Sequence, residues 1–121
     1  MEYNEYGIAK RYAEQLATQM RKGLLSYLVL IIAHQPINPS DIIRRLHEAG
    51  MTVVEGTIYP LLLRLQRDGL LEHEWRDNPD GPPRKYYRIT DFGQSVASEL
   101  DKEINIINKT MRSLKKERDN E

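Results

Sequence analysis

The first third of the chain repeats apolar residues at helical spacing. An apolar side chain stands at every fourth position of the opening stretch, at Ile8, Tyr12, Leu16 and Met20. Because such spacing keeps side chains on one face of a helix, residues 4–20 are predicted to form an amphipathic helix. Residues 21–34 are apolar on almost every side, so they are predicted to form a second, more central helix.

A third helix is predicted over residues 39–49, and its two ends have clear signals. Asn38 is a preferred capping residue, Pro39 suits the first helical position, and Gly50 is a typical stop. The predicted inward face consists of Ile42, Ile43 and Leu46.

The next helix, predicted from about Glu55 to Gly69, contains a proline. Its buried face has the spacing i, i+3, i+4, i+7, at Ile58, Leu61, Leu62 and Leu65. A proline inside a helix costs roughly 3 kcal/mol, because it removes a hydrogen bond and crowds the carbonyl four residues back. A helix that begins near Glu55 places Pro60 in its early turns, where the crowded residue is Gly56. A bent core helix with a solvated back face is a sufficient structural explanation, so a functional one needs further support.

Two alternating stretches then predict a β-hairpin. Residues 70–76 place Leu71, His73 and Trp75 on one side, and residues 85–89 place Tyr87 inward. Residues 77–83 are rich in turn formers, which predicts a connection longer than a tight turn. Tyr87 and Trp75 are both predicted to pack in the interior.

A long amphipathic helix is predicted to follow the Thr90 cap and begin at Asp91. Its stripe is Phe92, Val96, Leu100, Ile104, Ile107, Met111 and Leu114. Some 25 residues span roughly 37 Å, which exceeds the width of a domain of this size. We therefore expect a homodimer built from the first and last helices, with the interface at Ile8, Tyr12, Leu16, Leu100, Ile104, Ile107, Met111 and Leu114. The alternative is that the two helices pack on each other within one chain.

Composition narrows the function classes without deciding among them. The chain has 121 residues, enough for one domain, and 18 basic against 18 acidic residues. There is no cysteine, His34, His47 and His73 lack metal-ligand spacing, and no catalytic motif is present. We therefore expect no metal, no cofactor and no enzymatic activity. Without a membrane span or a secretory signal, the expected location is the cytoplasm.

The three helices predicted within residues 21–69, followed by the hairpin, have the order of a winged helix-turn-helix. This is a mainly α fold with a two-stranded β wing. The predicted organisation is an N-terminal helix over 1–20, a DNA-binding domain over 21–90 and a dimerisation helix with a charged tail over 91–121. Two segments, "GTIYPLLLRLQRDGL" and "GPPRKYYRIT", in this order and spacing, resemble the PadR-type transcriptional regulators. The resemblance extends over residues 20–95. One departure is "NPSDI", where relatives often have a Gly-Tyr pair.

The resemblance implies where DNA would bind. The start of the recognition helix corresponds to Thr57, Tyr59 and Pro60, with Arg64 one turn later, and the basic wing corresponds to Arg84 and Lys85 after a Gly81-Pro82-Pro83 tip. Phosphate contact and entry into the minor groove are both open for the wing pair. Ordinary solvated charge is the alternative for Arg64 and, with more weight, for Arg67, and protection of the strand edge is the alternative for Lys85.

The sequence thus predicts a dimeric, sequence-specific DNA-binding repressor on a pseudo-palindromic operator. In similar regulators a small molecule often releases the DNA, and Tyr12, Met20 and Tyr27 are candidates for lining an effector cavity, or for ordinary core. The main alternative is a winged-helix module that binds a protein without DNA, which the balanced charge favours slightly because DNA-binding domains tend to be basic. A small-molecule-binding dimer that acts by sequestration has less support.

Overall fold

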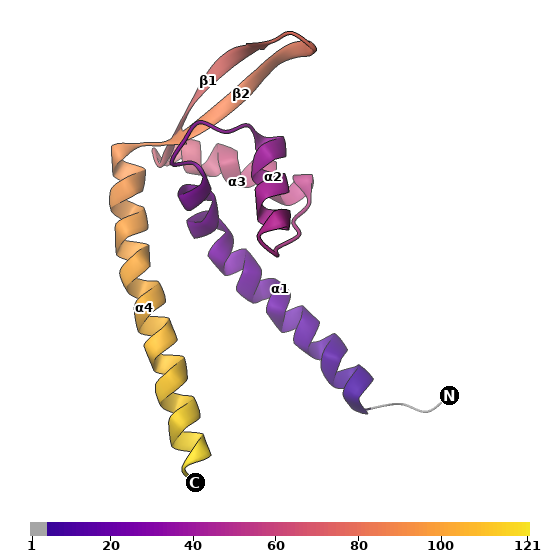
Figure 1. Cartoon of the computed structure of the whole chain (residues 1–121), viewed down its shortest axis with the longest axis vertical. Helices are drawn as coiled ribbons and strands as arrows, with labels where there is room; N and C mark the ends of the chain where they lie inside the picture. The colour runs from indigo at the N-terminus through magenta and orange to yellow at the C-terminus, as the bar shows by residue number, and fades with distance from the viewer. Residues whose placement is uncertain (1–4) are drawn as a thin grey trace.

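The computed structural model describes residues 5–121, and it confirms the mainly helical architecture with a two-stranded wing (Figure 1). The first helix was predicted to begin at residue 4, which lies outside the described residues. The elements, in chain order, are α1 Glu5–Ile32, α2 Pro39–Glu48, α3 Glu55–Arg67, β1 Leu71–Asn78, β2 Gly81–Ile89 and α4 Asp91–Asp119.

Helix α1 is one continuous helix, so the prediction of two separate helices is wrong. The predicted boundary lies between residues 20 and 21, and Gly23 is a weak helix former close to it. A single glycine costs a helix interior about 1 kcal/mol, which packing at one end of the helix can offset. The boundary drawn after residue 20 therefore falls within α1.

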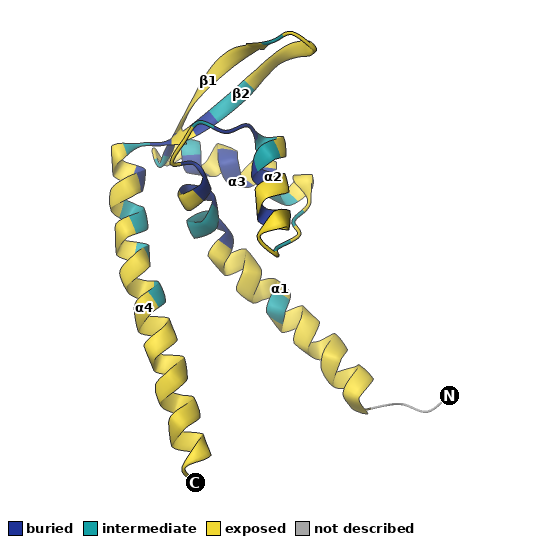
Figure 2. Cartoon of the chain, in the orientation of Figure 1, coloured by how far each residue is buried: buried dark blue, intermediate teal, exposed yellow. Residues whose placement is uncertain are grey.

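The core lies where α1, α2, α3 and the base of the hairpin meet (Figure 2). The side chains that are almost fully buried are Val29, Leu30, Ile42, Ile58, Leu62 and Leu71. Helix α1 contributes to this core only from Leu25 onward, so the prediction that the apolar stretch after residue 21 is central is confirmed for its second half.

Local capping signals fix the helix ends as predicted. The Asn38 side chain accepts a hydrogen bond from the Asp41 backbone N–H at 2.9 Å. Thr90 accepts from the Gly93 N–H at 3.0 Å, and its hydroxyl donates to the Gly69 carbonyl at 2.6 Å. Gly50 and Gly69 follow α2 and α3 with φ values of 111° and 83°, a conformation that favours glycine.

The hairpin is tighter than predicted, because Pro79 and Asp80 alone connect the two strands. Asn78 pairs with Gly81, and the Asp80 N–H donates to the Asn78 side chain at 3.1 Å, as in an Asx turn. A register shift between Arg76 and Asn78 helps the prolines of β2 to fit into a strand that is paired on one side. The predicted tip at residues 81–83 therefore moves back to Pro79-Asp80.

The loop between α1 and α2 fastens the hairpin to the helical body. Ile37 and Tyr87 exchange two backbone hydrogen bonds, of 3.0 and 2.8 Å. This bridge places the beginning of α2 beside β2. It also buries Tyr87, as the sequence predicts.

Helices α1 and α4 diverge below the body, and their outer halves are exposed (Figures 1 and 2). They are joined near the body, where Tyr27 of α1 donates a hydrogen bond to the Asp101 carboxylate of α4. This bond raises the pKa of the Tyr27 hydroxyl above its ordinary value. Further out, the side chains of Tyr12 and Leu114 are 64% and 60% exposed. The two apolar stripes therefore do not cover each other within one chain.

Candidate DNA-binding interface

Helix α3 presents an exposed ridge along the side opposite its buried leucines. The ridge consists of Gly56, Pro60, Leu63 and Arg67, all of which are exposed. Helix α3 begins at Glu55, as predicted, so Pro60 lies in its second turn. The backbone hydrogen bond that Pro60 cannot donate would have gone to the Gly56 carbonyl. A Cβ added at Gly56 would meet no atom within 4 Å.

The six predicted contact residues do not form one cluster, because they lie on both flanks of this ridge. On one flank, Tyr59 lies near Arg84 and Lys85 of the hairpin. On the other flank, Thr57 and Arg64 lie near α1, and Pro60 borders the same hollow from the ridge. The ridge and its flanks together form a surface that reaches from α1 to the wing.

A groove lies between α3, the beginning of α2 and the hairpin. Its volume is about 420 Å³, and the residues around it are Asn38, Pro39, Ser40, Tyr59, Leu63, Trp75, Arg84, Lys85 and Tyr87. Five of these nine residues are apolar or aromatic, two are polar, both charged residues are cations, and no acidic residue lines the groove.

On the other flank, a shallower hollow of about 180 Å³ separates α3 from α1. Lys22 and Leu25 of α1 line it together with Thr57, Pro60, Leu61 and Arg64. The side chain of Arg21 borders the adjoining depression, where it donates a hydrogen bond to the Thr18 hydroxyl at 3.3 Å. The second half of α1 therefore adds positive charge beside α3. This charge belongs to the stretch of residues 21–70, in which six basic residues outnumber four acidic ones.

Most of the cations on this surface have no carboxylate partner. Within residues 5–121, Arg64, Arg84 and Lys85 form no ion pair with a carboxylate, and neither do Arg21 and Lys22. The arginine at position 67 lies 3.5 Å from Asp68. Unpaired cations can bind phosphates without first losing a carboxylate partner, which favours Arg64 over Arg67 as a contact.

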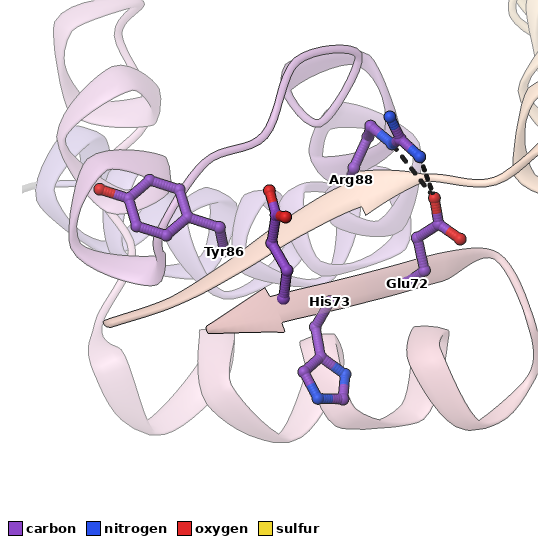
Figure 3. A pocket seen from close by; sticks show the side chains of 5 residues that line it. Glu72, His73, Tyr86 and Arg88 are labelled. Carbon is purple, nitrogen blue, oxygen red and sulfur yellow. Dashed lines mark hydrogen bonds and ion pairs between the residues drawn. The ribbon is translucent and has the colours of Figure 1, made fainter. Parts of the chain in front are cut away.

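On the outer face of the hairpin, in contrast, Arg76 and Arg88 pair with carboxylates of the same face, as Figure 3 shows for Arg88 and Glu72. The Arg88 Nε lies 3.1 Å from a carboxylate oxygen of Glu72, and Arg76 pairs with Glu74 at 2.6 Å. The Arg76 guanidinium also lies 4.5 Å from the centre of the Tyr86 ring. The hollow of about 260 Å³ on this face is lined by Glu72 and Glu74 as well, so it offers little to an anion.

The tip of the wing is acidic. Asp77 and Asp80 flank the turn and are exposed. Arg84 and Lys85 lie further back along the strands, where they are opposite Arg76 and Trp75 in the strand register. An acidic tip would be repelled by the strongly negative minor groove. Of the two roles left open for Arg84 and Lys85, phosphate contact is therefore the one that this geometry favours.

Comparisons with known proteins identify the fold and its family. The model of the transcriptional regulator PadR-like family matches residues 28–99, more than half of the chain. The chain belongs to the PadR-like family of transcriptional regulators. Among solved structures, it resembles a PadR-like transcription factor from Bacteroides fragilis at 46% identity, with a TM-score of 0.71 over 83% of this chain and 98% of that one. It also resembles a PadR family regulator from Eggerthella lenta at 30% identity, with a TM-score of 0.83 over 88% and 95% of the two chains.

Two curated relatives match a smaller part of the chain. The transcriptional regulator Rv3488 of Mycobacterium tuberculosis is 37% identical over 67 residues, which are 55% of this chain and 62% of that protein. An uncharacterized protein from Lysinibacillus sphaericus is 43% identical over 51 residues, 42% of this chain and 47% of its own length. The chain therefore spans about half to three fifths of these two relatives. No helix within residues 5–121 is both long and apolar enough to cross a bilayer.

At this surface of the PadR-like chain, the structure corrects the prediction for one aromatic residue. It also adds surface residues that the sequence did not indicate. Trp75 was predicted to pack in the interior, but its side chain is 63% exposed. It shares a face of the hairpin with Tyr87, yet the body ends before it reaches Trp75. Leu63, at 56% exposure, was also not foreseen, although it is the one leucine of α3 outside the buried spacing. Lys22 and Ser40 join the surface through tertiary folding.

Proposed function

We propose that this PadR-like chain is a dimeric, sequence-specific DNA-binding repressor. In this proposal, the ridge of α3 enters the major groove, where Thr57, Tyr59 and Pro60 meet base edges, and Arg64 binds the backbone beside it. Arg84 and Lys85 of the wing bind phosphates on the other flank. The operator is double-stranded DNA with pseudo-palindromic half-sites.

The observation that supports this proposal most strongly is the distribution of unpaired positive charge. The chain has no net charge, but unpaired cations flank the exposed ridge of α3 on both sides, while Arg76 and Arg88 on the outer face of the wing pair with carboxylates. Five unpaired cations beside one exposed helix give a chain without net charge a positive surface that fits DNA.

The dimer is proposed from the exposed apolar stripes. Ile8, Leu16, Ile107 and Met111 are exposed on helices that leave the body, and Ile104 is half-buried. Leu100, also predicted at the interface, packs partly against the core of its own chain. An apolar stripe of this length on a protruding helix is stabilised by burial against another apolar surface, and a second copy offers the same stripes.

Repression and release by a small molecule remain inferences from the resemblance. Tyr12 and Met20 are exposed in the single chain, so they form neither core nor an enclosed cavity there. An effector site that uses them would have to be completed by the partner's helices. Repression itself follows if the operator overlaps a promoter.

The direct test is fluorescence anisotropy with the DNA upstream of the chain's own gene and with a scrambled duplex, at two salt concentrations. Phosphate neutralisation releases counterions, so specific binding is expected to be tight on the upstream duplex and to weaken steeply with salt. Equal, weak binding to both duplexes would place the operator elsewhere. No binding to either at low salt would favour the protein-interaction module instead.

Four substitutions separate affinity from specificity. Arg84→Ala or Lys85→Ala is expected to weaken binding evenly across sequences and to lower the salt slope by about one per lost phosphate contact. Thr57→Ala or Tyr59→Ala is expected to relax the sequence preference as well, because these side chains face the bases. The measurement is anisotropy on the operator and on single-base variants.

Arg88→Ala is the matched control for the wing, since it removes the same charge from the same hairpin. Because Arg88 is paired with Glu72 on the outer face, its loss is expected to leave the affinity almost unchanged. If none of the four contact substitutions changes the affinity, the assignment of the interface is wrong.

A further inference from the structure

The indole of Trp75 is exposed, and packing of the fold does not account for its position. It belongs to the groove between α3, the beginning of α2 and the hairpin, beside Tyr59 and Leu63, which are 43% and 56% exposed. Three large apolar side chains of one groove thus face solvent together. Contiguous exposed apolar surface of this kind marks a binding site more often than scattered exposed residues do.

The charge of the groove restricts what can bind there. Lys85 pairs with Trp75 across the two strands, and its ammonium lies 5.0 Å from the centre of the Tyr87 ring. Neither Lys85 nor Arg84 has a carboxylate partner within residues 5–121, and no acidic residue lines the groove. The occupant should therefore combine negative charge with apolar surface.

The place of the groove selects among such occupants. It opens beside Tyr59, on the flank of the α3 ridge, and the hairpin forms its other wall. A duplex whose major groove receives α3 must pass one of its backbones between α3 and the wing. A sugar–phosphate strand presents the required combination, because the faces of its deoxyribose rings are apolar and its phosphates are anionic.

We propose that this groove holds one backbone strand of the operator, with a deoxyribose packed on Trp75 and Leu63 and the next phosphate bound by Lys85. The proposal rests on the proposed DNA-binding function and adds Trp75 and Leu63 to the interface. These contacts fix the register of the protein on the duplex without reading the sequence.

The test uses Trp75 as its own reporter, because it is the single tryptophan of the chain. The protein, at a fixed concentration, is titrated with labelled duplex while the anisotropy of the label is followed, and the quenching of tryptophan emission by acrylamide is measured on the same samples. Trp75 is expected to be readily quenched in the free protein and protected in the complex. Protection should saturate at the same DNA concentration as the anisotropy.

The two readouts fail separately. If the anisotropy does not change, the proposed DNA-binding function has failed. If the anisotropy changes fully while acrylamide still quenches Trp75 as in the free protein, the groove does not hold the backbone and this inference is overturned. Protection of Trp75 by benzoate but not by the duplex would make the groove a site for small aromatic anions and would also overturn it.

Variants give a second, independent readout. Trp75→Ala is expected to weaken binding by about five- to ten-fold on the operator and the scrambled duplex alike, as for an anchor residue at an interface, and Trp75→Phe should restore most of the loss. Tyr86→Ala is the matched control, because it removes an aromatic ring from the opposite face of the same hairpin. Equal affinities of Trp75→Ala and the unaltered protein would contradict the proposal.

Discussion

Replacing Ile107 with glutamate is expected to separate the protein into monomers and to weaken operator binding by about 10²- to 10⁴-fold, the advantage that two linked binding events have over one. Ile107 lies in the middle of the exposed stripe of α4. In the proposed dimer it would be buried, and a buried carboxylate without a partner is strongly unfavourable. Sedimentation velocity at micromolar concentration measures the first effect, and anisotropy on the operator measures the second.

Asn105→Glu is the control for this experiment, since it adds the same charge two residues away. Two residues correspond to about 200° of rotation, so position 105 lies on the opposite face of α4. The control is expected to remain dimeric with unchanged affinity. A dimeric Ile107→Glu variant that binds the operator normally would show that the stripe of α4 is not the interface.

Gly93→Ala is expected to destabilise the fold by about 3 kcal/mol or more, a larger effect than typical overpacking. Gly93 lies in the first turn of α4, where the helix passes over the base of the hairpin. A Cβ built there would lie 2.2 Å from the Leu70 carbonyl oxygen and 2.7 Å from the Ile89 side chain. The carbonyl belongs to the backbone, and the Leu70 oxygen already accepts the Thr90 N–H at 3.0 Å, so it cannot move without breaking that bond. Thermal unfolding followed by circular dichroism is expected to show a midpoint lower by on the order of 10 °C.

Gly23→Ala provides the opposite expectation with the same chemical change. No atom lies within 4 Å of a Cβ added at Gly23, which is in the interior of α1. Alanine there should stabilise the helix by about 0.5–1 kcal/mol. Both variants have to be compared at one protein concentration, because dimer formation makes the midpoint concentration-dependent. A Gly93→Ala protein that unfolds at the same temperature as the unaltered chain would contradict the packing described for α4.

The features that the sequence predicted correctly depend on neighbouring residues. Asn38 and Thr90 cap helices through side-chain bonds to residues three positions later, so their role is visible in a short window. The position of Pro60 in the early turns of α3 followed in the same way from the start at Glu55. The fold class followed from the order of these elements, and the family from two motifs within them.

The features that it missed depend on tertiary structure. Strand alternation placed Trp75 on the same face as Tyr87, but it could not show that the body beneath the hairpin ends before Trp75. A sequence that contains Gly23 is compatible with two helices or with one continuous helix. The structure shows one continuous helix, α1. Which arginines keep a carboxylate partner, as Arg67 does and Arg64 does not, depends on side-chain positions that no spacing rule provides.

Hydroxyl-radical footprinting of a duplex that the protein binds tests the central claim most directly, because it locates both recognition helices at once. A dimer that inserts two α3 helices is expected to protect two segments whose centres lie about 10 bp, or a multiple of this, apart, with the backbone beside each segment covered by the wings. Protection of a single segment, or of evenly spread positions without a two-fold pattern, would contradict a dimeric winged-helix regulator that reads two half-sites.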